Sequence, residues 1–245
     1  MTDRIFEIGK AGLESSDQRV HKMMDNMINE PVPGYKKTDA VVRGFPFELD
    51  AADKRLTAMI PQVDDTYTDN TAGTLAKTNN KLDLALGSKG FFVLQAPWGE
   101  GYTRDGRFHL DRDGRLLSVA GNLPVLGHAG PIMVPEGSDV QISQSGQVLV
   151  DGVEVDSIRV VVPQNYKAFE SMNGSLFKLN GRDANIVEVE NPHVIQGYVE
   201  ASNVSIVDQT MTMMMLERVY TINSKIIQTR DANLSKAMDL GKASP

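Results

Sequence analysis

Two short patterns in this sequence have residue types and spacing that could do chemistry. Ser175 and Lys178 match the Ser-x-x-Lys pattern of a lysine-activated serine nucleophile, but the partner patterns Ser-Asp-Asn and Lys-Thr-Gly are absent. Residues 111–114 (Asp-Arg-Asp-Gly) resemble part of a calcium loop. Aligning the glycine puts His109 and Ala120 at the first and twelfth positions, where the loop needs an oxygen ligand and a glutamate. A hydrolase using Ser175 therefore stays a remote alternative, and a turn explains residues 111–114 better.

The remaining candidates for chemistry are histidines, and their positions do not suggest a site. The chain has 4 His, widely dispersed, without metal-ligand spacing. It has no Cys, which excludes disulfides, thiolate metal sites and a cysteine nucleophile. We therefore expect no enzyme, and no catalytic, cofactor-binding or metal-binding residue.

Composition excludes further classes of protein. The 245 residues carry 25 basic and 32 acidic side chains, a net charge of −7, and 41% are hydrophobic. This is typical of a globular protein, and it argues against nucleic-acid binding because no basic surplus exists to neutralise phosphates. No apolar run is long enough to span a membrane, so we expect no membrane insertion. Asp3 and Glu7 interrupt the start of the chain, which does not resemble a cleaved secretory signal.

Residues 4–29 predict one long helix. Asp3 can cap its N-terminus, and Pro31 and Pro33 end it, since the residue before a proline avoids the helical conformation. Apolar or small residues recur every three or four positions on one face: Ile5, Ile8, Gly12, Ser16, Val20, Met23 and Met27.

Residues 203–240 predict a second helix, because they contain neither Gly nor Pro. Asn203 is its expected N-cap and Gly241 its expected C′ residue. One apolar stripe follows its length, formed by Val207, Met211, Met215, Val219, Ile222 and Ile226.

Two long amphipathic helices at opposite ends of the chain predict coiled-coil pairing, with each other or with copies in other subunits. The alternative is two ordinary surface helices on one globular domain. Methionines at 211–215 suit either an adaptable peptide groove or a helix seam, and their recurrence in the first helix favours the seam. The predicted assembly interface comprises Ile5, Ile8, Val20, Met23, Met27, Val207, Met211, Met215, Val219, Ile222 and Ile226.

The middle of the chain predicts β-structure. Asp-Gly pairs at 105–106, 113–114 and 151–152 indicate tight turns between short alternating segments, which favours an antiparallel barrel or a rolled sheet. The fold class is therefore α+β. The expected parts are an N-terminal helix region (1–36), an extended crossover with short strands near 40–42 (37–80), a β-rich domain (81–180), a return crossover (181–202) and a C-terminal helix region (203–245).

Three stretches resemble the rod and hook proteins of the bacterial flagellar basal body. The first, Asn26 to Lys36, is similar to the family signature Asn-Asn-x-Ala-Asn-x-x-Thr-x-Gly-Tyr-Lys. The second comprises Gly90-Phe-Phe and residues 102–114, and the third runs from Gln196 to Val204 and continues in residues 217–225. The matching family-motif residues are Asn26, Asn29, Gly34, Tyr35, Lys36, Ser202, Asn203, Asn223 and Lys225.

The resemblance implies a structural subunit that polymerises helically into the rod and transmits motor torque to the hook. It implies export through the flagellar type III apparatus and a place in the periplasmic part of the basal body. The implied partners are copies of this chain, other rod and hook subunits, and the export apparatus.

The subtype and the role each have an alternative. Length and residues 130–137 are more similar to the proximal-rod F type, and residues 222–229 to the distal-rod G type; we favour the proximal type. The signature departs from the family at Pro31-Val32, which could alter the turn after the first helix. The alternative function is a periplasmic binding or assembly factor whose β domain grips a partner and whose helices dimerise.

Overall fold

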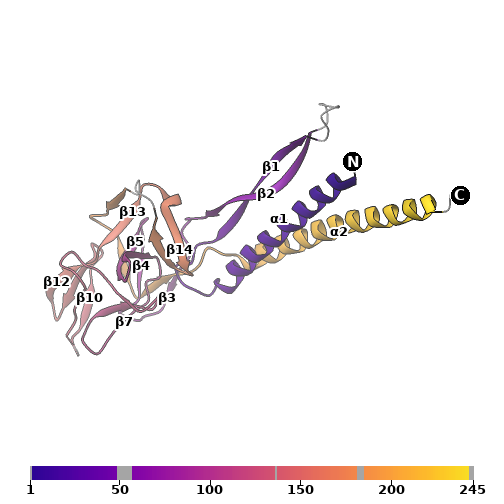
Figure 1. Ribbon diagram of the computed structural model, residues 1–245. Coiled ribbons are helices and arrows are strands. Elements are labelled where there is room, and N and C mark those ends of the chain that lie inside the picture. Colours follow the sequence, from indigo (N-terminus) through magenta and orange to yellow (C-terminus); the bar gives the residue numbers. More distant parts are fainter. Residues whose placement is uncertain (1, 49–56, 136, 181–184, 243–245) are drawn as a thin grey trace. The chain divides into compact units, whose positions relative to one another are not determined.

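The computed structural model describes residues 2–48, 57–135, 137–180 and 185–242, and its fold class is α+β (Figure 1). The chain forms two compact units. Unit 1 comprises Met1–Ile28, Thr38–Asp69 and Ser205–Pro245, and unit 2 comprises Asn29–Lys37 and Asn70–Val204.

Unit 1 contains two long helices, α1 (Thr2–Ile28) and α2 (Ile206–Lys242). The predicted bounds of α1 are right to within two residues. For α2, the predicted N-cap Asn203 is wrong: Ser205 precedes the helix, and its Oγ accepts a hydrogen bond from the Asp208 amide at 3.3 Å. This serine bond satisfies an otherwise free amide of the first turn.

The expected end of α2 at Gly241 is also wrong, because the helix continues through this glycine to Lys242. Glycine only weakens a helix by about 1 kcal/mol relative to alanine. A glycine therefore allows a helix to end but does not force it to end. A proline, by contrast, would break the helix.

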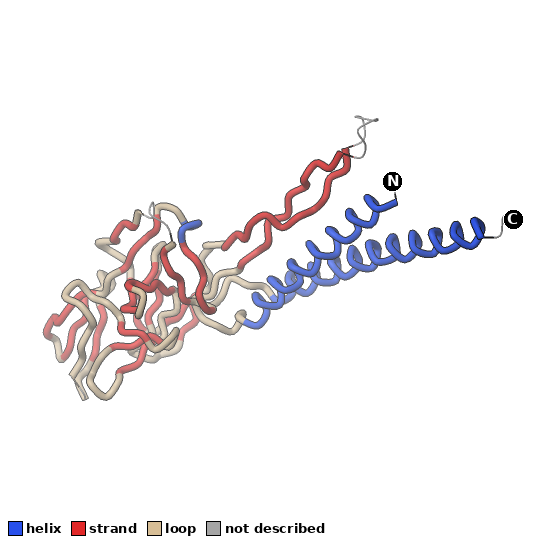
Figure 2. Tube along the Cα trace, in the orientation of Figure 1, coloured by secondary structure: helices blue, strands red, loops and turns tan. Residues whose placement is uncertain are grey.

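The two helices lie side by side and antiparallel within unit 1 (Figure 2). Small residues on α1 let them approach closely: a Cβ added at Gly12 would lie 2.7 Å from the Asn223 amide nitrogen. Nearer the chain ends, the Arg230 guanidinium lies over the Phe6 ring, 5.1 Å from its centroid. The terminal helices therefore pack on each other in one chain, while coiled-coil geometry between them stays a prediction.

A long antiparallel hairpin completes unit 1. Its strands are β1 (Thr38–Glu48) and β2 (Thr57–Thr68), paired from Thr38↔Thr68 to Glu48↔Thr57 with a bulge at Val41/Val42. Both strands contact α1. The expected crossover with short strands underestimates this element, because Pro46, Pro61 and several aspartates weaken the strand signal in the sequence.

The described residues of unit 2 form short strands in five sheets. The largest is open and six-stranded, in the order β14-β15-β6-β5-β13-β16. The others are β10-β11-β12, β7-β8-β9, β17-β4 and β18-β3. Among the described strands no sheet closes into a barrel, so of the two predicted architectures the barrel is wrong.

The strands before residue 125 are β3 (Leu75–Lys77), β4 (Leu84–Leu86), β5 (Phe91–Ala96), β6 (Gly99–Thr103), β7 (Phe108–Leu110), β8 (Leu116–Ser118) and β9 (Leu123–Pro124). Those after it are β10 (Val140–Ile142), β11 (Gln147–Val150), β12 (Val153–Ser157), β13 (Val160–Pro163), β14 (Phe169–Asn173), β15 (Leu176–Leu179), β16 (Ile186–Glu188), β17 (Val194–Gln196) and β18 (Tyr198–Glu200). One 3₁₀ helix spans Tyr166–Ala168.

Two apolar clusters form the core of unit 2. The larger joins aliphatic side chains of many strands to Phe92 and Phe108, whose rings meet edge to face at 5.2 Å. The smaller is aromatic, with Phe91, Tyr102 and Phe177 at its centre. Alternate residues of β5 enter different clusters, Phe92 and Leu94 the larger and Phe91 and Val93 the smaller, so both faces of this strand are buried.

The expected return crossover also belongs to the sheets. Three strands fall in it: β16 pairs with β13, β17 with β4, and β18 with β3. Residues 181–184 of this segment lie outside the described residues.

The predicted Asp-Gly turns have different outcomes. Asp151 and Gly152, with φ of 51° and 83°, form the two-residue turn between β11 and β12, as predicted. Residues 113–114 end the turn between β7 and β8. Residues 105–106 do not form a tight turn: Asp105 is buried, and both its carboxylate oxygens accept bonds from Arg107.

Candidate assembly site

The apolar stripe predicted on α2 is exposed in the single chain. The relative exposures of its residues run from 43% at Ile226 to 68% at Val207. By contrast, Leu216 and Gln209 on another face of α2 are both 3% exposed. At 3.6 residues per turn the two faces lie roughly 120° apart around the helix. The stripe therefore faces away from α1 and is free to be covered by another molecule. Its members are Val207, Met211, Met215, Val219, Ile222 and Ile226, and we call it the α2 stripe.

The stripe predicted on α1 lies within unit 1. Met23 is 5% exposed, and Ile8, Val20 and Met27 are half-buried, because α1 contacts both α2 and the β1–β2 hairpin. The side chain of Ile5 lies outside the described residues. Met23 is therefore covered within the single chain, and its contribution to contacts between subunits stays a prediction.

Asn26 fixes the position of the hairpin on α1. Its side-chain Nδ2 donates to the Thr38 main-chain oxygen at 2.8 Å, and the Thr38 amide donates to its Oδ1 at 2.9 Å. The Asn26 side chain thus takes the place of a neighbouring strand at the start of β1. Its burial is complete, so loss of these bonds would leave polar groups without water.

The segment between α1 and β1 carries four more family-motif residues, all in unit 2. Gly34 has φ +71°, and a Cβ there would lie 2.3 Å from the main chain of Arg104, so only glycine fits. Its amide donates to the main-chain oxygen of Glu200 at 2.7 Å. Tyr35 is buried beside it, and Asn29 is half-buried.

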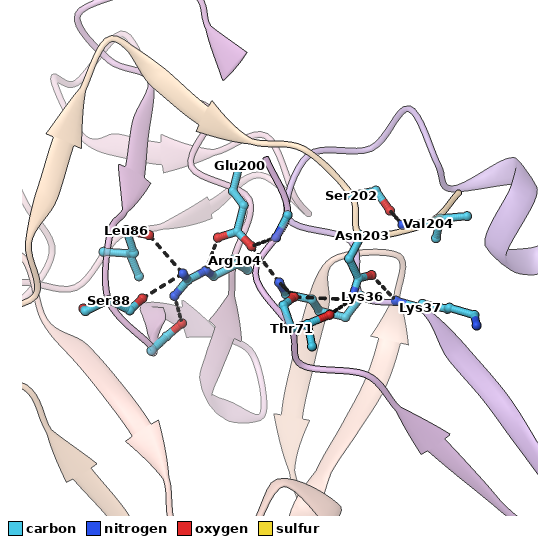
Figure 3. A network of polar contacts seen from close by, with 12 residues as sticks. Lys36, Lys37, Thr71, Leu86, Ser88, Arg104, Glu200, Ser202, Asn203 and Val204 are labelled. Atoms are coloured by element: carbon cyan, nitrogen blue, oxygen red, sulfur yellow. Dashed lines mark hydrogen bonds and ion pairs between the residues drawn. The ribbon is translucent and has the colours of Figure 1, made fainter. Parts of the chain in front are cut away.

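The fourth residue, Lys36, belongs to a buried ion network centred on Glu200 (Figure 3). Glu200 is 1% exposed. Its Oε1 accepts bonds from Lys36 Nζ at 2.6 Å and from the Gly73 amide at 2.9 Å, and its Oε2 accepts from Arg104 Nε at 2.5 Å. One carboxylate therefore holds three chain segments that are far apart in sequence.

Main-chain oxygens complete the environment of the two cations. Lys36 Nζ also donates to the Thr71 oxygen at 2.7 Å. The Arg104 guanidinium donates to the oxygens of Leu86, Ser88 and Gly90, so that it is anchored between β4 and β5 (Figure 3). Buried cations need such partners, because an unpaired buried charge is costly.

The charge state of Glu200 follows from these contacts. Burial alone would raise the pKa of the Glu200 carboxyl, but the Arg104 charge and the bond and charge of Lys36 outweigh it and lower this pKa. The carboxylate is therefore ionised at neutral pH.

Asn203 and Ser202 hold the chain just before α2. Asn203 Oδ1 accepts from the Lys37 amide at 2.8 Å, and its Nδ2 donates to Thr71 Oγ1 at 3.1 Å. Ser202 Oγ accepts from the Val204 amide at 3.2 Å. These residues order the chain before the helix, which explains why Asn203 is not the cap itself.

The last two family-motif residues lie on α2 and differ in environment. Asn223 is half-buried and faces Gly12 of α1, whereas Lys225 is exposed.

The patterns that could have done chemistry have structural roles. Ser175 is buried at 3% exposure, and its main-chain oxygen accepts from Thr103 Oγ1. Asp111 Oδ1 accepts from the amides of Asp113 and Arg115, as expected of a turn. Over the described part of the chain, no cluster of His, Cys, Asp and Glu could hold a metal ion.

Sequence reasoning missed Arg104 and Glu200 as a site. Both lie in stretches that resemble the rod family, but a charged residue in a sequence is read as exposed unless its partner is known. Arg104 and Glu200 are far apart in the sequence, and no local spacing connects them.

Comparisons with known proteins agree with the resemblance. The family described as "Flagellar basal body rod FlgEFG protein C-terminal" matches residues 195–240. The family "Flagellar hook protein FlgE/F/G D1 domain" matches residues 85–150. The flagellar basal-body rod protein FlgF of Salmonella typhimurium is 32% identical over 88% of this chain and 89% of its own length. The chain belongs to the flagellar basal-body rod protein family.

Other basal-body rod proteins match along nearly their whole length. FlgF of Caulobacter vibrioides is 31% identical over 98% of this chain and 99% of its own. FlgG of Buchnera aphidicola from Acyrthosiphon pisum is 29% identical over 95% of this chain and 98% of its own. The family is structural and belongs to the flagellar basal body. None of the helices among the described residues of this rod protein has the length and apolarity to cross a membrane.

Proposed function

We propose that this chain is a subunit that polymerises helically in the flagellar rod and transmits motor torque toward the hook. The observation that carries the proposal is the α2 stripe, which stays exposed although α2 already packs on α1. Contact with neighbouring subunits would remove this apolar surface from water, and full burial of such a side chain is worth about 1.5–3 kcal/mol.

The geometry of α2 supports an extended assembly. The helix has 37 residues, so at 1.5 Å per residue it is about 56 Å long and can contact more than one neighbour. A contact between different surfaces of identical subunits does not close on itself and generates a helical filament. Copies of this chain and other rod or hook subunits are the proposed partners.

Export and location follow from the same proposal. We infer that the chain leaves the cytoplasm through the flagellar type III apparatus and assembles in the periplasmic part of the basal body. Relatives of both the F and the G type match this chain at similar identity, and the proximal position stays our preference.

Deletion and complementation test this function. The gene is deleted in the bacterium that carries it, and basal bodies are imaged by electron cryotomography with and without the wild-type chain. We expect truncated rods in the deletion, and the point of truncation identifies the segment that this chain builds.

A second measurement separates the rod subunit from the assembly factor. Light scattering coupled to gel filtration should show a monomer that forms larger species at high concentration. Normal rods in the deletion strain, or a closed dimer at every concentration, would favour an assembly factor instead.

A further inference from the structure

The chain passes between the two units four times, after residues 28, 37, 69 and 204. These four covalent connections are routes by which load on unit 1 can reach unit 2. What holds their ends within unit 2 therefore decides whether load reaches the sheets or only displaces the connecting segments.

The Glu200 network holds the ends of three of these connections together. Lys36 and Lys37 precede the second crossing, Thr71 follows the third, and Asn203 precedes the fourth. Direct bonds link all of them: Lys36 to Glu200 and Thr71, Lys37 to Asn203, and Asn203 to Thr71 (Figure 3).

Arg104 connects this group of segments to the sheets. It donates to the Glu200 carboxylate and to three main-chain oxygens at the end of β4 and the start of β5. β5 lies inside the six-stranded sheet, between β6 and β13. A displacement of Glu200 would therefore break its bond to Arg104 or pull Arg104 away from the segment that leads into β5.

We propose that Glu200, with Lys36 and Arg104, is the load-bearing joint of unit 2, which locks the crossing segments to the sheets. The proposal rests on the proposed rod function and adds the residues through which torque enters unit 2. Glu200 is a positioning residue in this role, since it acts through Lys36, Gly73 and Arg104, which it holds.

The chemistry of the network suits resistance to displacement of the segments better than a contribution to net stability. Burial of ion pairs often contributes little net stability, and apolar residues of similar volume can replace them. Apolar contacts have no preferred direction, so packed segments can slide past each other. Hydrogen bonds between charged groups are short and directional, and a slide of even one residue would break several of them at once.

Hydrogen exchange on the full chain tests the joint. We compare Lys36→Met and Glu200→Gln with the exposed controls Lys89→Met and Glu190→Gln, which make the same chemical changes elsewhere in unit 2. We expect exchange at the amides of Gly34, Lys37 and Gly73 to accelerate by about tenfold or more in the network variants only. Exchange within β5 should accelerate less than at these three amides, because the network variants open the crossing segments before the sheets.

Two results would overturn the joint. Unchanged exchange at these three amides would show that the network does not hold the segments. Equal acceleration in β5 would show that the variants only destabilise unit 2 as a whole.

A rotation assay tests the load. Cells that carry Lys36→Met should build rods, but beads attached to their filaments should rotate more slowly than wild type at high load. Wild-type rotation at high load would overturn the proposed transmission of load by the network. A lack of rods in this variant would also overturn it, because the network would then be needed for assembly. If the wild-type chain itself were absent from rods, the proposed function would fail first.

Discussion

The side chain of Asn26 exchanges two hydrogen bonds with the main chain of Thr38, at 2.8 and 2.9 Å. One residue on the last turn of α1 thereby determines where β1 begins. The same asparagine is the first residue of this chain that matches the family signature, and its two bonds give the position a structural role.

Replacing Asn26 by alanine should loosen the hairpin from α1. Both Thr38 groups would lose their bonds to Asn26 at a part-buried position, and the loss of a hydrogen bond costs about 0.5–1.5 kcal/mol. We expect a lower melting temperature of the helical circular dichroism signal and faster amide exchange in β1. Gln18→Ala, at an exposed position on the same helix, is the control and should change neither measurement.

Close approach of the two helices depends on Gly12. Leucine there would clash with Asn223 and separate α1 from α2, at a cost of about 1–3 kcal/mol. We expect the helical signal of Gly12→Leu to melt earlier than that of wild type or of the exposed control Gln18→Leu. A double-mutant cycle of Gly12→Ala and Asn223→Ala should give a favourable coupling, since the second change removes the clash; independent effects would contradict the contact.

A charge in the α2 stripe should prevent assembly without unfolding the chain. Val219→Asp and Ile226→Asp each place a carboxylate on a surface that we propose to be buried between subunits. Basal bodies should lack complete rods, while exchange within the sheets of unit 2 stays as in wild type. Gln228→Asp, exposed on a different face of α2, should assemble normally. Complete rods in both stripe variants would show that this face is not an interface.

Stability of unit 2 should fall in acid because of Glu200. Its pKa is lowered in the folded chain, so the ionised carboxylate stabilises the fold fully above the unfolded value of about 4.3. This stabilisation is lost as the pH falls from that value through the lower folded pKa. Asp111 and Asp139 also have lowered pKa values and act in the same direction.

The variant Glu200→Gln separates the contribution of Glu200 to the pH dependence of stability from that of the other carboxylates. Near neutral pH the variant keeps Lys36 and Arg104 buried without their anion, and it should be destabilised by about 3 kcal/mol or more. Its urea unfolding should lose the part of the pH dependence that Glu200 supplies, whereas Glu190→Gln should keep it. An identical pH dependence in wild type and Glu200→Gln would refute the assignment.

Both helices and the β-structure in the middle of the chain could be predicted because their signals are local. The spacing of Ile8, Val20 and Met23 marks the buried face of α1, and the dipeptide at 151–152 marks a hairpin turn. The α2 stripe was found on the same periodicity, but the pattern alone could not tell which apolar face meets α1. Gln209 and Asn223 lie on the inner face of α2, and polar residues there look exposed in a sequence.

What could not be predicted depends on distant partners. Residues 105–106 have the form of a turn, yet the carboxylate of the buried Asp105 is paired with the partly exposed Arg107 and no tight turn forms there. The bond from Arg104 to Glu200 joins positions that are 96 residues apart, so no periodicity reports it. The β1–β2 hairpin was underestimated because its residues have weak strand propensity. Its two strands are held by their pairing with each other and by their contacts with α1.

Segments of unit 1 lie before and after both segments of unit 2, so unit 2 consists of two insertions, residues 29–37 and 70–204, within the polypeptide of unit 1. Such an arrangement lets one module change in size or surface while the frame around it keeps its own interior contacts. Swapping residues 29–37 and 70–204 together between relatives should therefore yield chimaeras that retain the helix pair, because the bonds of Gly34, Lys36 and Lys37 to Glu200 and Asn203 stay within the exchanged module. Such exchange gives lineages a way to diversify unit 2 without altering the interior of unit 1.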